Sequence, residues 1–179
     1  MSGLPLASSC TQAMTIVAGV GRRLSGTVLL SGLLLLPLNG CGGDPTGVEF
    51  EVIEETTFAP SLGVDLTQMR RLSNGSYVRD LVEGSGAAAA YGPSLTVTYE
   101  GWLTDGTRFD GGQITFTLGS GRMPLGFEDG LLGLQVDGTR QVVVPPARGF
   151  GGLAQIGQGG VTVPPGSVLV YHMTLDGVM

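Results

Sequence analysis

Cysteine and histidine, which form disulfides and bind zinc, are scarce in this chain of 179 residues. The two cysteines, Cys10 and Cys41, lie outside any C-x-x-C pattern, and His172 is the single histidine. This set cannot supply the cysteine and histidine ligands of a zinc site at their usual spacings. We therefore expect no cofactor, no metal and no disulfide framework.

Aromatic and apolar side chains fall on the inward faces of predicted strands, namely Tyr99, Phe109, Ile114 and Tyr171. Periodicity alone favours reading them as plain core. Asp110 follows a turn, a place where an aspartate is usually a solvated cap. On the residue pattern by itself, a core and a binding pocket both remain open.

Short strands and one helix must position these residues. Alternating patterns predict strands over residues 77–83, 94–103, 113–118, 139–144 and 167–176. A hairpin turn at 105–106 leads from the second of these into a separate short segment, 107–110. Phe127, Leu131 and Leu134 form one apolar stripe at i, i+4 and i+7, which predicts a helix over 126–134. We expect an α+β fold in which a curved antiparallel sheet of about five strands wraps around this short helix.

Composition narrows the class of protein. The 32 glycines favour a turn-rich, strand-based domain. The formal charge is −6, and every basic residue is an arginine. An acidic surface without a basic stripe repels phosphate backbones, so we expect no nucleic-acid partner.

Three ordered sequence blocks resemble the FKBP-type peptidyl-prolyl cis/trans isomerase family. Residues 97–110, VTYEGWLTDGTRFD, are similar to the family's second strand and the bulge after it. Residues 126–131, GFEDGL, resemble its helix, and residues 163–171, VPPGSVLVY, resemble its closing block. The order and spacing of the blocks hold across roughly residues 80–179. This favours the interpretation that the inward-facing aromatic residues line a binding pocket over the interpretation that they are plain core.

The resemblance implies an apolar bowl for the ring of a substrate proline, with Phe127 beneath the ring and Asp110 at the rim. It assigns catalysis to Tyr99, Phe109 and Asp110. It assigns substrate binding to Ile114, Met123, Phe127, Phe150, Val163 and Tyr171. Strand parity places Trp102 and His172 away from the bowl.

The implied activity is rotation about X-Pro bonds of proline-containing polypeptides, which needs no cofactor. Two departures from the family pattern bear on it. Pro124 stands where the family usually has an apolar residue whose backbone N–H holds the ligand, and proline has no N–H. Phe150 stands where many members have tyrosine. We expect a weaker isomerase with reduced affinity for macrolide inhibitors; a non-catalytic proline-peptide-binding module and a structural envelope lipoprotein are the alternatives.

The N-terminal part resembles a bacterial lipoprotein leader. Arg22 and Arg23 precede an apolar run over residues 28–38, which is shorter than a membrane-spanning helix requires. Cys41 then follows a lipobox-like stretch. We expect a signal peptide over 1–40, lipidation at Cys41, a flexible acidic linker over 41–60 and an isomerase domain over 61–179. An ordinary signal peptide and an uncleaved anchor are the alternatives. The domain would be a monomer on the periplasmic or extracytoplasmic side of the cell envelope.

Overall fold

The computed structural model describes residues 47–179. The predicted signal peptide 1–40 and the predicted lipidation site Cys41 lie outside the described residues. No helix within 47–179 is both long and apolar enough to cross a bilayer.

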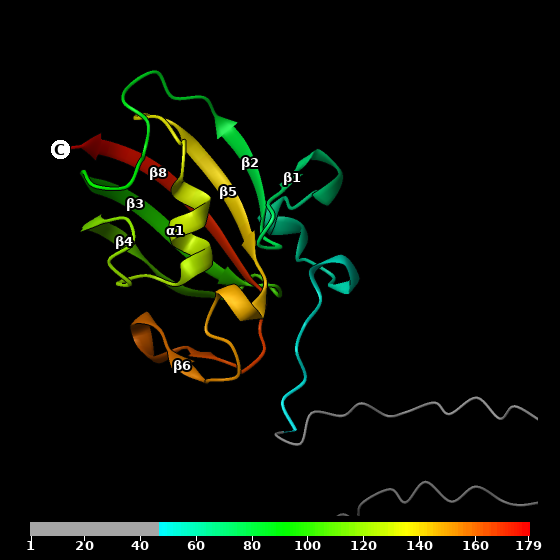
Figure 1. Ribbon diagram of the computed structural model, residues 1–179. Helices are drawn as coiled ribbons and strands as arrows, with labels where there is room; N and C mark the ends of the chain where they lie inside the picture. Colours follow the sequence, from blue (N-terminus) through cyan, green and yellow to red (C-terminus); the bar gives the residue numbers. More distant parts are fainter. Residues whose placement is uncertain (1–46) are drawn as a thin grey trace, which may run out of the picture. The chain divides into compact units, whose positions relative to one another are not determined.

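The described residues form a six-stranded antiparallel sheet in the order β1-β2-β5-β8-β3-β4 (Figure 1). In that order the strands are Arg70–Arg71, Tyr77–Val82, Thr139–Val144, Leu169–Val178, Ser94–Leu103 and Arg108–Thr117. The sequence predicts about five strands, and the sixth is the two-residue β1. Residues 107–110 and 113–118, predicted as separate segments, belong to one strand, β4, because the backbone of Gly111 and Gly112 stays paired with β3.

The helix α1, Leu125–Leu131, packs against β5 and β8 on one side of the sheet (Figure 1). Phe127 and Leu131 are fully buried in this contact. The helix ends three residues before the predicted limit of 134. Gly133 has a φ of 76°, a left-handed conformation that ends helices. The Arg140 guanidinium donates hydrogen bonds to the carbonyls of Gly130 and Leu132, at 2.9 and 3.0 Å, at this end of the helix.

A second apolar cluster covers the opposite side of the sheet. Its buried members are Ile53, Leu62, Met69, Tyr77, Val143, Val168 and Val170. Three short 3-10 turns carry the N-terminal contribution: Ile53–Glu55, Pro60–Leu62 and Leu66–Gln68. Both faces of the sheet are therefore covered, which agrees with the continuous apolar runs 142–144 and 168–171.

The described part of the predicted linker, residues 47–60, differs from the prediction of a flexible spacer. Ile53 is 3% exposed within the second cluster, and Tyr77 Oη donates to Glu54 Oε1 at 2.7 Å. The segment is acidic, but one buried isoleucine and this hydrogen bond fasten it to the sheet. The folded unit thus begins before residue 61.

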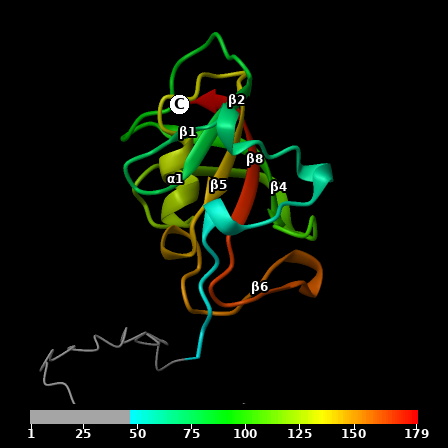
Figure 2. The ribbon, with the colours of Figure 1, turned by 90° about the vertical axis from the view of Figure 1, so that its right-hand side faces the viewer.

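The connection from β5 to β8 is long and carries a small hairpin. It holds a 3-10 turn, Pro146–Arg148, then β6, Gln155–Ile156, a second 3-10 turn, Gln158–Gly160, and β7, Thr162–Val163. Figure 2 shows this connection beside the start of the described chain. We refer to residues 149–163 as the mouth loop, because they include Phe150 and Val163.

Candidate functional site

Strand register brings the predicted site residues onto one face of the sheet. Tyr99 lies opposite Met173 of β8, and Gly101 lies opposite both Asp110 of β4 and Tyr171 of β8. The β3–β4 register shifts between Gly101 and Trp102. A β-bulge of this kind re-aims side chains.

Phe127 of α1 lies at the centre of an aromatic cluster. Its ring meets those of Tyr99 and Tyr171 at centroid distances of 5.2 Å, with interplanar angles of 84° and 89°. Phe109 meets Tyr171 at 5.8 Å, again edge to face. Edge-to-face pairs fix ring orientation as well as burying apolar area. Tyr99 and Tyr171 therefore hold defined ring orientations against Phe127, and Phe109 holds one against Tyr171.

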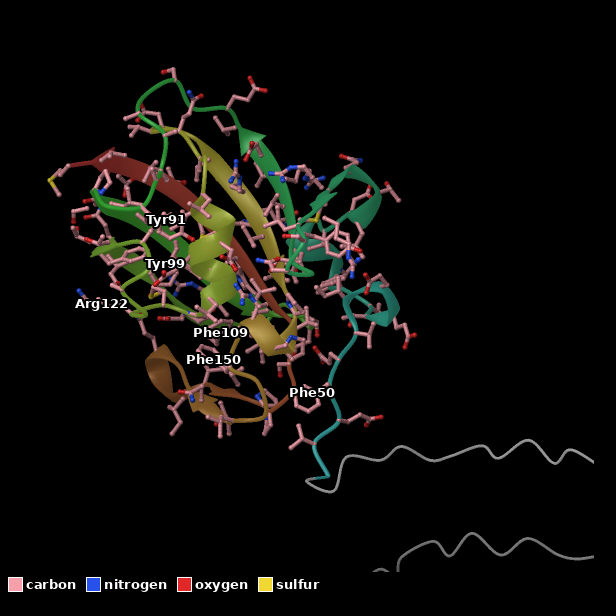
Figure 3. The ribbon with its side chains drawn as sticks, in the orientation of Figure 1. Phe50, Tyr91, Tyr99, Phe109, Arg122 and Phe150 are labelled. Atoms are coloured by element: carbon pink, nitrogen blue, oxygen red, sulfur yellow. The ribbon has the colours of Figure 1, made fainter. Side chains whose placement is uncertain are left out.

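The remaining predicted binding residues border the same cluster. Phe150 of the mouth loop meets Phe109 at 6.2 Å, and Figure 3 shows the two labelled residues near each other. Val163 is buried, whereas Ile114, Met123 and Phe150 are partly buried against the cluster. The apolar site residues predicted from the sequence thus all belong to one apolar cluster on this face of the sheet or pack against it. They are therefore part of the apolar core on this face, and a binding pocket at this place stays a prediction.

The carboxylate of Asp110 is held at both oxygens. Tyr99 Oη donates to Oδ2 at 3.0 Å, and the Gly111 amide donates to Oδ1 at 2.8 Å. Burial, followed by the nearby charge of Asp110 and the hydrogen bond to it, raises the pKa of Tyr99 to about 12. Burial also raises the pKa of Tyr171. Both phenols therefore stay protonated at neutral pH and can donate hydrogen bonds.

Gly101 makes close packing of the aromatic rings possible. A Cβ atom at this position would lie 2.8 Å from Tyr171 Cε1 and 2.9 Å from Phe109 Cζ. Gly101 was not among the predicted site residues. Its signal is a glycine inside an otherwise alternating strand, which marks a bulge or a close approach.

Pro124 and Phe150 occupy the edge of the site. Pro124 directly precedes α1, and its carbonyl accepts hydrogen bonds from Phe127 N and Glu128 N at 2.9 and 3.2 Å. The backbone here therefore continues straight into the helix, and position 124 has no N–H to offer a ligand. Phe150 supplies a ring without a hydroxyl. Both departures noted in the sequence therefore fall beside the aromatic cluster.

Glu128 is a supporting residue that sequence reasoning missed. It is 5% exposed, and its Oε2 accepts a hydrogen bond from Gly119 N at 2.6 Å. This bond ties the loop after β4, which carries Met123, to the helix that carries Phe127. An acidic residue in the first helical turn has an ordinary dipole explanation, so the sequence holds no clear signal for the contact.

Trp102 and His172 lie on the opposite face, as predicted. Their rings meet at 4.8 Å, and Trp102 packs against the second cluster. His172 Nε2 lies 2.9 Å from Gln141 Nε2. Burial lowers the pKa of His172. Within residues 47–179, no three histidine, cysteine, aspartate or glutamate side chains group in an arrangement able to hold a metal ion.

Comparison with known proteins agrees with this geometry. Residues 86–176 match the FKBP-type peptidyl-prolyl cis-trans isomerase family. An FK506-binding protein of Neisseria meningitidis serogroup B (strain ATCC BAA-335 / MC58) is 37% identical over 106 residues, covering 56% of this chain and 94% of its own. An FK506-binding protein of Neisseria meningitidis serogroup C is 37% identical over 103 residues, covering 55% of this chain and 91% of its own.

Solved structures show the same fold. FkpA from Escherichia coli has a TM-score of 0.53 and 27% identity, covering 62% of this chain and 51% of its own. AtFKBP13 has a TM-score of 0.56 and 26% identity, covering 62% of this chain and 98% of its own. With its antiparallel sheet and its short helix beneath an aromatic cluster, the chain belongs to the FKBP-type peptidyl-prolyl cis-trans isomerase family.

Proposed function

We propose that this protein is a peptidyl-prolyl cis/trans isomerase that assists the folding of exported, proline-containing proteins. The observation that carries the proposal is the aromatic cluster around Phe127, with the doubly held Asp110 carboxylate next to it. It brings closely packed aromatic rings and one oriented charge together.

The reaction is rotation about an X-Pro bond, and it breaks no covalent bond. Amide resonance sets the barrier at roughly 18–20 kcal/mol. At the top of the barrier the amide is twisted, resonance is lost and the proline nitrogen is pyramidal. An apolar surface that excludes water favours this less polar, twisted amide over the planar one. Catalysis is then the tighter binding of the twisted state.

The polar groups at the rim have separate parts in this mechanism. The Tyr99 hydroxyl and the Gly111 amide hold the Asp110 carboxylate in one orientation. Its fixed negative charge acts on the changing dipole of the rotating amide. The site lacks an N–H at Pro124 and a hydroxyl at Phe150. It therefore holds the substrate carbonyl with fewer hydrogen-bond donors than the family pattern provides. Each missing hydrogen bond weakens binding by about 0.5–1.5 kcal/mol.

A second candidate function follows from those same two residues. A site that holds proline segments of exported chains but turns them over slowly would act as a binding module on the same fold. Pro124 and Phe150 favour this reading, since both remove donors from the edge of the cluster. Tyr99, Phe109 and Asp110 favour the enzyme.

We further propose that Cys41 is lipidated after removal of residues 1–40 and that the domain works at the cell envelope. The support is the order of a basic pair, an apolar run and a cysteine in the sequence. Acyl chains contribute about 0.8 kcal/mol per buried methylene, so several together give stable anchoring. Labelled fatty acid should enter the wild-type chain, and a Cys41→Ser variant should lose the label. Equal labelling of both would reject this site.

Acceleration of a proline-limited refolding reaction tests the proposed activity. Uncatalysed X-Pro isomerisation takes roughly 10–100 s at 25 °C, so it appears as a separate slow phase. The full chain should shorten this phase in proportion to its concentration. An unchanged slow phase, together with retained binding of the unfolded chain, would favour the binding module.

A further inference from the structure

The segment before the first 3-10 turn runs along the turn that closes the β5–β8 connection. The amide of Glu51 donates to the carbonyl of Gly166 at 2.9 Å. The Glu51 carboxylate accepts a hydrogen bond from the Val168 amide at 2.7 Å. Both the backbone and the side chain of one residue therefore hold the turn 164–168. Residues 49–52 are called the strap below.

The turn 164–168 in turn holds the mouth loop. The amide of Gly166 donates to the carbonyl of Gly151 at 2.8 Å, and Gly151 directly follows Phe150. A Cβ atom on Gly152 would lie 3.6 Å from Phe50 Cζ, so the strap's aromatic ring lies against the same stretch. Figure 3 shows Phe50 on the side of the mouth loop where the N-terminal segment passes. The strap is thus two hydrogen bonds away from the residue that follows Phe150.

Gly166 is required by this contact for two reasons. Its φ of 77° lies in the left-handed region, which side chains rarely adopt. A Cβ atom at this position would also collide with the carbonyl oxygen of Glu49. A glycine is therefore needed for the strap to lie this close to the turn.

The start of the mouth loop has weak support of its own. The other backbone hydrogen bonds donated by Gly149, Gly151 and Leu153 end on Pro145, Pro146 and Phe150, which all lie in the same stretch. Leu153 and Ile156 are 67% and 78% exposed, so they bury little surface. The strap contacts therefore add to the packing of Phe150 against Phe109 and to the burial of Val163 in fixing this loop.

We propose that Glu51 is a positioning residue that, through the turn 164–168, holds the mouth loop and Phe150 at the edge of the aromatic cluster. Val168 is fully buried, so removal of the carboxylate leaves a buried N–H without its partner. The loop would then loosen, and substrate binding would weaken more than the rotation step. The part of this inference that concerns catalysis rests on the proposed isomerase function.

The test compares Glu51→Ala, Glu51→Gln and Glu55→Ala in the full chain. The amide of Glu51→Gln keeps an oxygen that can accept from Val168 N. Glu55 is an exposed acid a short distance along the same segment, and it controls for loss of charge. Hydrogen exchange is followed for the amides of 149–163 and of 142–144 in β5. KM and kcat are measured with an X-Pro tetrapeptide.

We expect Glu51→Ala to speed exchange in 149–163 about tenfold and to leave 142–144 unchanged. KM should rise about three- to tenfold, with kcat within about twofold of wild type. Glu51→Gln should restore most of both values, and Glu55→Ala should resemble wild type. The proposal would be overturned if Glu51→Ala left exchange in 149–163 unchanged, sped exchange in β5 equally, or left KM unchanged. It would also be overturned if Glu51→Gln failed to restore these values, or if Glu55→Ala had the same effect as Glu51→Ala. A wild-type chain without activity would reject the isomerase function, and the exchange data would still decide whether the strap holds the loop.

Discussion

Tyr99 Oη and Asp110 Oδ2 lie 3.0 Å apart, across the pairing of β3 with β4, and the hydroxyl is the donor. The partners come from neighbouring strands, and the bond orients the carboxylate beside the aromatic cluster. Because Asp110 is also held by the Gly111 amide, loss of Tyr99 leaves one of its two hydrogen bonds in place.

This pair predicts unequal effects of mutation on catalysis. Asp110→Ala should lower kcat/KM by about tenfold or more, because the oriented charge disappears. Tyr99→Phe should lower it less, since Gly111 still holds the carboxylate. In the double variant, the added cost of Tyr99→Phe should nearly vanish, because its partner is gone. A fully additive double variant would contradict the proposed relationship between the two residues.

Pro124 predicts a gain of binding. Replacing it by isoleucine supplies a backbone N–H at the edge of the aromatic cluster. Pro124→Ile should tighten binding of an X-Pro tetrapeptide by about three- to tenfold, the value of one hydrogen bond, as measured by titration calorimetry. Leu125→Ile is the matched control, because position 125 already has an N–H and is exposed. Equal affinities for wild type and Pro124→Ile would show that this donor does not reach the ligand.

Gly130 predicts a loss of stability. A Cβ atom there would lie 2.7 Å from Val142 Cγ2 and would push α1 away from β5. Gly130→Ala should lower the free energy of unfolding by about 1–3 kcal/mol, as overpacked cores do. Gly177→Ala is the control, since a Cβ atom at that position would have nothing within 4 Å. Urea unfolding measures both, and a neutral Gly130→Ala would show that the helix–sheet contact can relax.

The raised pKa of Tyr99 predicts a loss of stability at alkaline pH. Its pKa is about 12 in the folded chain, against an ordinary value of 10.0. Between these values the unfolded chain binds fewer protons than the folded one, so the free energy of unfolding falls as pH rises. Tyr171, whose pKa burial also raises, contributes in the same direction.

Urea unfolding between pH 9 and 11 checks this prediction. Wild type should keep its stability up to about pH 9 and lose it progressively above about pH 10. Tyr99→Phe should lose less over the same interval, because one of the groups that titrate is absent. Identical losses in the two proteins would contradict the assignment to Tyr99.

Strands with strict alternation and clear ends could be predicted from the sequence. Residues 94–103 and 139–144 coincide with β3 and β5, the second being stopped by Pro145 and Pro146. Strand β4 was predicted in two pieces because Gly111 and Gly112 carry no side-chain pattern, although their backbones stay paired. Periodicity depends on the alternation of polar and apolar side chains. It therefore does not detect a strand whose backbone pairing continues through glycines.

The aromatic cluster could also be predicted, because its members lie in three ordered blocks of sequence. The supports of the site could not. The bonds from Val168 to Glu51 and from Gly119 to Glu128 join backbone amides to distant carboxylates, and neither leaves a periodic signal. The stretch 47–60 was interpreted as part of a spacer because it is acidic, with glutamates at positions 49, 51, 54 and 55. Burial of Ile53 nevertheless fixes it to the sheet.

Catalysed cis/trans exchange in an X-Pro tetrapeptide, followed by exchange NMR, tests the central claim most directly. Full-chain wild type is compared with Asp110→Ala and with His172→Gln, whose side chain lies on the opposite face of the sheet. We expect wild type and His172→Gln to bring the two isomers into fast exchange, and Asp110→Ala to do so at least about tenfold more slowly. Peptide binding by wild type without faster exchange, or equal rates for wild type and Asp110→Ala, would contradict it.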